Sequence, residues 1–167
     1  MSDLVDKAGK TVQRISSELR PGLLDDLGLT AAIKWQLVEF QKRTGMRCEL
    51  SLNPEDIILD QDISTALYRI LQEALTNILK YACATSVKVR LKESTKAIGL
   101  EVIDNGRGIT DEQILSHQSF GLIGMWERVH LLQGEIRIFG MKGKGTAIII
   151  KIPLRRENGK DDQNLYC

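Results

Sequence analysis

The 167-residue chain has the length of one domain of ordinary size with a short additional element. Its 23 Lys and Arg residues balance 22 Asp and Glu residues, which argues against direct binding of nucleic acid or an acidic membrane surface. No apolar run approaches the roughly 20 residues that span a bilayer, no signal peptide follows Met1, and the three cysteines are widely spaced. We therefore expect a cytoplasmic domain with reduced thiols; membrane anchorage of a longer parent protein stays open.

Residues 4–19 carry an apolar seam with the spacing of a coiled-coil helix. Its members recur at steps of three and four residues: Val5, Ala8, Val12, Ile15 and Leu19. Arg20-Pro21-Gly22 ends the segment. Two heptads are too few for a stable isolated coiled coil. Residues 1–21 are therefore predicted to be the end of a longer bundle helix, and a surface helix packed on its own domain is the alternative.

The following elements alternate between helices and strands. We expect a helix over 29–44 capped by Gly45, a strand over 48–52, and a long helix over 62–82. Period-two patterns predict strands over 87–91 and 98–102, followed by a glycine-rich polar loop over 104–120. A helix over 122–132 and strands over 135–139 and 147–152 complete the order, and residues 155–167 form a polar tail predicted to be disordered. This order predicts an α+β fold, a two-layer sandwich with a mixed sheet of about five strands and helices on one face.

Polar residues interrupt the buried face of the long helix. Glu73, Asn77 and Lys80 are spaced by four and three residues, so all three lie along one edge of that face. A carboxylate can accept a proton, an amide oxygen suits Mg²⁺, and an ammonium group suits phosphate. Taken alone, this cluster is better explained as an ordinary solvated helix edge.

Two glycine-rich clusters follow. Asp104-Asn105-Gly106-Arg107-Gly108 comes directly after a strand, where a carboxylate can accept the exocyclic amine of adenine and glycines allow close backbone approach. Gly121 and Gly124 precede a helix whose N-terminus can hold phosphate, and the stretch 143–146 precedes the last strand. Each cluster alone is also a simple turn.

In this order the four pieces resemble the boxes of histidine kinases. Residues 72–82 (QEALTNILKYA) look like the N box, residues 104–109 like the first glycine box, residues 120–125 like the second and residues 143–146 like the last. The resemblance covers roughly residues 19–154. It implies the ATP-binding fold shared by gyrase, heat-shock chaperone, histidine kinase and MutL ATPases, known as the Bergerat fold, over a domain of residues 22–154.

The resemblance implies a role for each matching position. Glu73, Asn77 and Lys80 would be catalytic, with Asn77 coordinating Mg²⁺, Lys80 touching phosphate and Glu73 acting as the base or as a polarising group. The residues implied to bind ATP are Asp104, Gly106, Gly108, Ile109, Gly121, Leu122, Gly124, Gly145 and Thr146. Residues 110–119 would be the lid over the nucleotide.

The resemblance also implies partners. The ATP γ-phosphoryl group would pass to a histidine on the protein's own dimerisation domain and then to a response regulator, within a homodimeric full-length protein. Residues 19–29 and 122–129 are similar to a subfamily that works with regulators carrying LuxR-type output domains.

The chain departs from the family pattern at three places. Tyr81 replaces the usual N-box histidine, Ser119 replaces a glycine of the second box, and no histidine followed by an acidic residue is present as a phosphoacceptor. His117 and His130 are therefore expected to be incidental. The alternatives are a stand-alone ATPase of the gyrase, chaperone or MutL branch, an anti-sigma-factor type serine kinase, and a non-enzymatic nucleotide-binding module.

Overall fold

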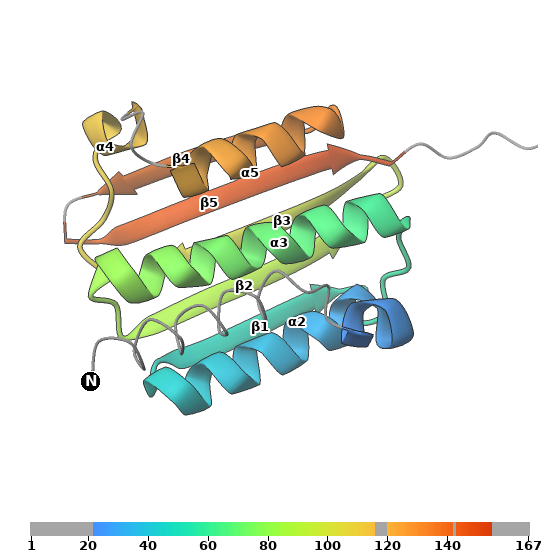
Figure 1. Cartoon of the computed structure of the whole chain (residues 1–167), viewed down its shortest axis with the longest axis horizontal. Coiled ribbons are helices and arrows are strands. Elements are labelled where there is room, and N and C mark those ends of the chain that lie inside the picture. Colours follow the sequence, from blue (N-terminus) through green and yellow to red (C-terminus); the bar gives the residue numbers. More distant parts are fainter. Residues whose placement is uncertain (1–21, 116–119, 142, 155–167) are drawn as a thin grey trace, which may run out of the picture.

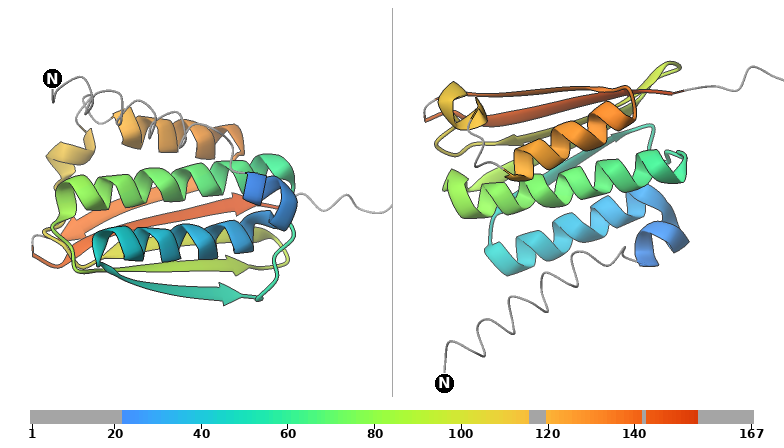
Figure 2. Two further views of the ribbon diagram at one scale, coloured as in Figure 1. Left: turned by 60° about the horizontal axis from the view of Figure 1, so that its bottom comes forward. Right: turned by 45° about the horizontal axis from the view of Figure 1, so that its top comes forward.

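Three helices pack on one face of a five-stranded sheet, as predicted. The computed structural model describes residues 22–115, 120–141 and 143–154. Helices α2 (Gly22–Thr44), α3 (Gln61–Asn77) and α5 (Phe120–Leu131) form one layer, and the sheet forms the other (Figures 1 and 2). The α+β class and the mixed sheet with helices on one face are therefore confirmed. The proposed bundle segment 1–21 and the polar tail 155–167 lie outside the described residues.

The sheet has the order β1-β2-β3-β5-β4. Its strands are β1 (Arg47–Asn53), β2 (Ser86–Glu93), β3 (Ala97–Asp104), β4 (Glu135–Met141) and β5 (Gly145–Pro153). Strand β1 pairs with β2 in parallel, and the other pairs are antiparallel. The period-two pattern sets which face is buried: Val87, Leu100 and Ile150 lie on the helix side and are almost fully buried. Strand β4 ends later than predicted, at Met141, and strand β5 begins earlier than predicted, at Gly145. The turn that connects them is therefore shorter than the sequence indicated.

Helix α2 differs from its prediction at its start. The expected helix over 29–44 is present and ends at Gly45, which has φ 72° and donates its N–H to the carbonyl of Gln41 at 2.8 Å. A further helical turn precedes it, and Gly28 joins the two with φ 81° and ψ 177°. The kink at Gly28 brings Leu24 into the core at 6% exposure.

The long central helix changes type at its end. The predicted helix over 62–82 is an α-helix only to Asn77 and continues as a π-helical turn, η1 (Ile78–Ala82). Cys83 follows in the left-handed conformation with φ 50°. Because a π turn bonds residue i to i+5, more consecutive side chains face one side than in an α turn.

The segment between β3 and α5 is not wholly irregular. It contains a short helix, α4 (Asp111–Leu115), which was predicted as loop. No helix in the three described stretches is long and apolar enough to cross a membrane.

Candidate functional site

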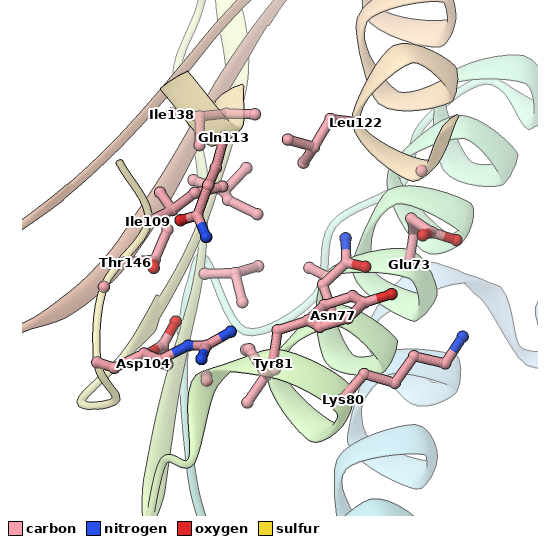
Figure 3. Close-up of a pocket in the computed structure, with 18 of the residues that line it drawn as sticks. Glu73, Asn77, Lys80, Tyr81, Asp104, Ile109, Gln113, Leu122, Ile138 and Thr146 are labelled. Atoms are coloured by element: carbon pink, nitrogen blue, oxygen red, sulfur yellow. The ribbon is translucent and has the colours of Figure 1, made fainter. Parts of the chain in front are cut away.

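A cavity of about 460 Å³ opens between the end of α3 and the sheet. Figure 3 shows the ends of β3 and β5 on one side and α3 with η1 on the other, with α5 entering above. Its size falls in the range of small-molecule sites. Most predicted site residues line it, namely Glu73, Asn77, Lys80, Asp104, Gly108, Ile109, Gly121, Leu122 and Thr146.

A buried carboxylate forms the sheet end of this cavity. Asp104 is the last residue of β3 and is 5% exposed. Its Oδ1 accepts a hydrogen bond of 2.7 Å from the N–H of Gly106. This buried acidic residue with one fixed oxygen gives the cavity a polar anchor. The apolar part of the lining comes from side chains that include Val102, Ile109, Ile138 and Ile148.

Backbone contacts clamp the glycine-rich loop after β3. The N–H of Arg107 donates to the carbonyl of Ala82 at 2.8 Å, and the carbonyl of Arg107 accepts the N–H of Gly143 at 2.8 Å. Gly106 is needed because a Cβ there would overlap the carbonyl of Ala82. Gly145 lies against the carbonyl of Asp104 in the same way. Neither glycine lines the cavity, so both act through the packing of the loop.

Asn105 ties this loop to the start of β2. Its Oδ1 accepts the N–H groups of Thr85 and Ser86, both at 2.9 Å, and its Nδ2 donates to the hydroxyl of Thr85 at 2.9 Å. The asparagine therefore satisfies three polar groups at once. These bonds fix the position at which the chain leaves the sheet after Asp104.

The opposite wall comes from α3 and η1. Glu73 and Asn77 are half-buried, one turn apart, while Lys80 and Tyr81 are exposed in the π turn. Figure 3 shows these side chains across the opening from Asp104 and Thr146. The structure therefore brings the acidic, amide and cationic groups of the N-box stretch to one cavity.

Helix α5 begins directly over Glu73. A Cβ at Gly121 would overlap the Glu73 carboxylate, so a larger residue at this position would have to displace that side chain. Leu122 of the same turn is buried and lines the cavity. Gly124, one turn further on, does not line the cavity, and its carbonyl accepts a 2.7 Å hydrogen bond from Arg128. The N-terminus of α5, where the first N–H groups have no carbonyl partner within the helix itself, thus meets the same cavity.

Helix α4 overhangs the cavity with its own cap. The N–H of Thr110 donates to Gln113 Oε1 at 3.0 Å, and the N–H of Gln113 donates to the Thr110 hydroxyl at 3.3 Å. This reciprocal pair is a capping box. Gln113 and Phe120 both line the cavity, whereas His117 and Ser119 lie outside the described residues.

No group of three or more His, Cys, Asp or Glu side chains that could hold a metal occurs in the described part of the chain. A divalent cation at this cavity would therefore need most of its ligands from water and from the bound molecule. Asn77 and Glu73 supply oxygen atoms of the type that Mg²⁺ prefers, and Mg²⁺ keeps several waters. The residues present fit such a shared site.

Several lining residues were not named as site residues from the sequence. Arg107 and Gln113 add polar groups, Phe120 adds a ring that is 81% exposed, and Ile138 and Ile148 add apolar surface. The Thr110-x-x-Gln113 spacing is a readable capping signal, and the period-two pattern already places Ile148 on the helix side of the sheet. Nothing local in the sequence indicates that Ile138 reaches this cavity.

Three solved structures of similar fold come from histidine kinases. The histidine kinase domain of the Erythrobacter litoralis EL346 blue-light activated histidine kinase has a TM-score of 0.65 at 20% identity, with 75% of this chain and 61% of that domain covered. The Acinetobacter baumannii histidine kinase AdeS has a TM-score of 0.66 at 16% identity, with 93% and 84% covered. The mycobacterial sensor histidine kinase MprB has a TM-score of 0.58 at 24% identity, with 74% and 93% covered. The chain thus spans less than two thirds of the first of these structures.

A family model matches the sequence over the elements that form the cavity. The model described as histidine kinase-, DNA gyrase B-, and HSP90-like ATPase matches residues 62–156, from the start of α3 past the end of β5. The matched region includes Glu73, Asn77, Asp104, Gly121 and Thr146, which all line the cavity. The chain therefore belongs to the family of histidine kinase-, DNA gyrase B- and HSP90-like ATPases.

Proposed function

We propose that this chain is the ATP-binding catalytic domain of a sensor histidine kinase. It binds ATP with Mg²⁺ and donates the γ-phosphoryl group to a histidine on a dimerisation domain, from which the group passes to a response regulator. The observation that carries the proposal is the arrangement of the cavity: a buried Asp104 at one end, and Glu73 and Asn77 beside the N-terminus of α5 at the other.

The base of ATP binds at the sheet end. Asp104 accepts the exocyclic amine of adenine, while Ile109, Ile138 and Ile148 pack against the faces of the ring. Gly108 and Thr146 line the same part, and the Thr146 hydroxyl can donate to or accept from the base. Gly106 and Gly145 hold the loop in place behind Asp104.

The phosphates bind at the helix end. The first N–H groups of α5, around Gly121 and Leu122, would donate hydrogen bonds to phosphate oxygens, and the positive end of the helix dipole favours an anion there. Gly124 lies about one turn further along α5 and does not line the cavity, so its part in binding phosphate is at most indirect. Lys80, exposed at the rim, adds a cation for the outer phosphate oxygens.

Asn77 would hold Mg²⁺ through its side-chain oxygen, and the cation would supply positive charge beside the phosphates. Glu73 accepts the proton of the incoming imidazole, or orients the imidazole ring, because the Glu73 carboxylate lies where α3 meets the first turn of α5. Lys80 orients the outer phosphate during this step.

The assignment among branches of the family rests on two observations. The three structures of similar fold described above are histidine kinases. The segment 1–21 has a coiled-coil seam suited to a dimerisation bundle. The intact protein is then a homodimer. The similarity of residues 19–29 and 122–129 to one histidine kinase subfamily favours a response regulator with a LuxR-type output domain. This domain itself does not contact nucleic acid directly.

One experiment separates this function from its alternatives. The chain is incubated with radiolabelled ATP and Mg²⁺, with and without the dimerisation domain of its parent protein. A histidine kinase places acid-labile phosphate on that domain. Free phosphate released at the same rate without an acceptor favours a stand-alone ATPase, and acid-stable phosphate on a partner favours a serine kinase. Absence of ATP binding in a calorimetric titration would refute all three.

A further inference from the structure

A polar side chain on the cavity wall has no part in the function proposed above. Gln113 lies in α4 and lines the cavity together with Ile109 and Thr146. In Figure 3 its amide group is turned toward the interior of the opening, on the same side as Ile109 and Thr146. This is the part of the cavity in which the base of ATP is proposed to bind. Gln113 is therefore a candidate for a direct contact with adenine.

The cap of α4 sets the orientation of this amide. Gln113 Oε1 accepts the N–H of Thr110 at 3.0 Å, and the N–H of Gln113 donates to the Thr110 hydroxyl at 3.3 Å. Because Thr110 directly follows Ile109, the first contact holds the amide beside the Ile109 part of the wall. The oxygen thus serves the cap, whereas the amide nitrogen carries two N–H donors and no acceptor. Gln113 therefore offers a ligand a donor.

A donor at this place complements the polar groups of adenine. The Asp104 carboxylate is buried and accepts hydrogen bonds, so it suits the exocyclic amine. The ring nitrogens of adenine are acceptors, and an acceptor that leaves water without finding a donor weakens binding. Ile109 and Ile138 line the same part of the cavity, and their side chains supply no donor. Gln113 Nε2 supplies one beside them.

We propose that Gln113 Nε2 donates a hydrogen bond to a ring nitrogen of adenine and thereby contributes to the choice of base. The proposal rests on the proposed binding of ATP in this cavity and adds a second polar contact to that of Asp104. A site that pairs its buried polar groups with those of the ligand rejects analogues that lack one of them. The base is then recognised by an acceptor on β3 and a donor on α4, the two elements that the glycine-rich loop joins.

Two substitutions have in common the loss of the Gln113 nitrogen. Gln113→Glu keeps an oxygen for the cap, since Gln and Glu both serve in a capping box, but it adds a negative charge. Gln113→Met has a similar length and adds no charge, but it removes the cap contact. An effect that both variants show therefore reports the N–H donors. Gln41→Glu is the matched control, because Gln41 Oε1 also accepts a backbone N–H, that of Cys48 at 2.9 Å, and Gln41 does not line the cavity.

Calorimetric titration with ATP and its deaza analogues, each with one ring nitrogen replaced by C–H, measures the contact. For the unaltered chain, at least one analogue should bind roughly 5- to 100-fold more weakly than ATP. Both Gln113 variants should lose most of this preference, and Gln41→Glu should keep it. All the nucleotides carry the same triphosphate, so the comparison between them cancels the repulsion between the added carboxylate of Gln113→Glu and the phosphates.

The other outcomes would overturn the proposal. One is an unchanged preference in both Gln113 variants while ATP still binds and still depends on Asp104, and this result leaves the proposed function standing. Another is equal binding of ATP and every analogue by the unaltered chain. A third is a loss of affinity in Gln113→Glu alone, equal for every nucleotide, which would reveal only a charge effect. Failure of the unaltered chain to bind ATP would instead refute the proposed function itself.

Discussion

Gly121 lies directly over the carboxylate of Glu73, so closely that a Cβ at position 121 would overlap its Oε1. The contact joins the first turn of α5 to the middle of α3, two elements separated by the whole of β2 and β3 in the sequence. The proposed base and the proposed phosphate-binding helix are thus positioned by each other.

Gly121→Ala should therefore damage the site without weakening the helix. Alanine is the better helix former by about 1 kcal/mol, but its methyl group must displace the Glu73 carboxylate. We expect phosphoryl transfer to a supplied dimerisation domain to fall on the order of tenfold to hundredfold. Gly124→Ala is the matched control, because its methyl group would meet only the flexible end of Arg128. Equal activity of the two variants would contradict the role of the contact.

Asp104→Ala should weaken ATP binding by about 1.5–3 kcal/mol, which is roughly 10- to 150-fold in the dissociation constant. The loss arises because the carboxylate is the charged acceptor at the apolar end of the cavity. Isothermal titration calorimetry measures it. Glu101→Ala, on the same strand but paired with Arg90 at the surface, should bind ATP as the unaltered chain does. Equal affinity in both variants would mean that the base lies elsewhere.

Gly145 and Gly143 offer a matched pair for the clamp around Asp104. Both have positive φ, 96° and 75°, so alanine strains the backbone at either position by about 1 kcal/mol. Only at 145 does the added methyl group meet backbone, namely the carbonyl of Asp104, whereas 143 faces open space. Gly145→Ala should lower the free energy of unfolding by about 1–3 kcal/mol more than Gly143→Ala. Urea unfolding followed by circular dichroism gives both values, and equal losses would count against the clamp.

Much of the fold follows from periodicity alone. The alternation in β2 and β3 predicts that Val89 and Leu100 are buried, and both are. The kink at Gly28 and the π turn at 78–82 could not be predicted in this way, because their residues also fit a continuous α-helix. The same limit applies to Gly106 and Gly145. Their sequence context indicates a ligand nearby, but they face backbone from distant segments, and no local pattern encodes that contact.

The proposed lid, residues 110–119, should exchange its amide hydrogens more slowly when nucleotide binds. Its described part, α4, has only five residues and depends on the capping box between Thr110 and Gln113. We expect amides of residues 111–115 to exchange rapidly in the free protein and several-fold more slowly with a non-hydrolysable ATP analogue and Mg²⁺. Thr110→Ala removes a cap worth about 0.5–2 kcal/mol and should reduce this protection. Equally slow exchange with and without the analogue would exclude a closing lid.

The chain should bind ATP and yet not phosphorylate itself. Transfer to histidine requires an imidazole about 3–3.5 Å from the γ-phosphorus and in line with the bond that breaks. His130 lines a different cavity, between α5 and β4, together with Trp126 and Arg137, and does not line the proposed ATP site. His117 lies outside the described residues, and no acidic residue follows either histidine to orient it.

Incubation with radiolabelled ATP and Mg²⁺ should leave this chain unlabelled while a separately supplied dimerisation domain gains acid-labile phosphate. Glu73→Ala and Asn77→Ala should slow that transfer strongly, and Asn77→Ala should also weaken the Mg²⁺-dependent part of ATP binding. Label that accumulates on this chain alone, and disappears in His117→Ala or His130→Ala, would show that its own imidazole reaches the nucleotide and would refute its assignment as a domain that needs a separate acceptor.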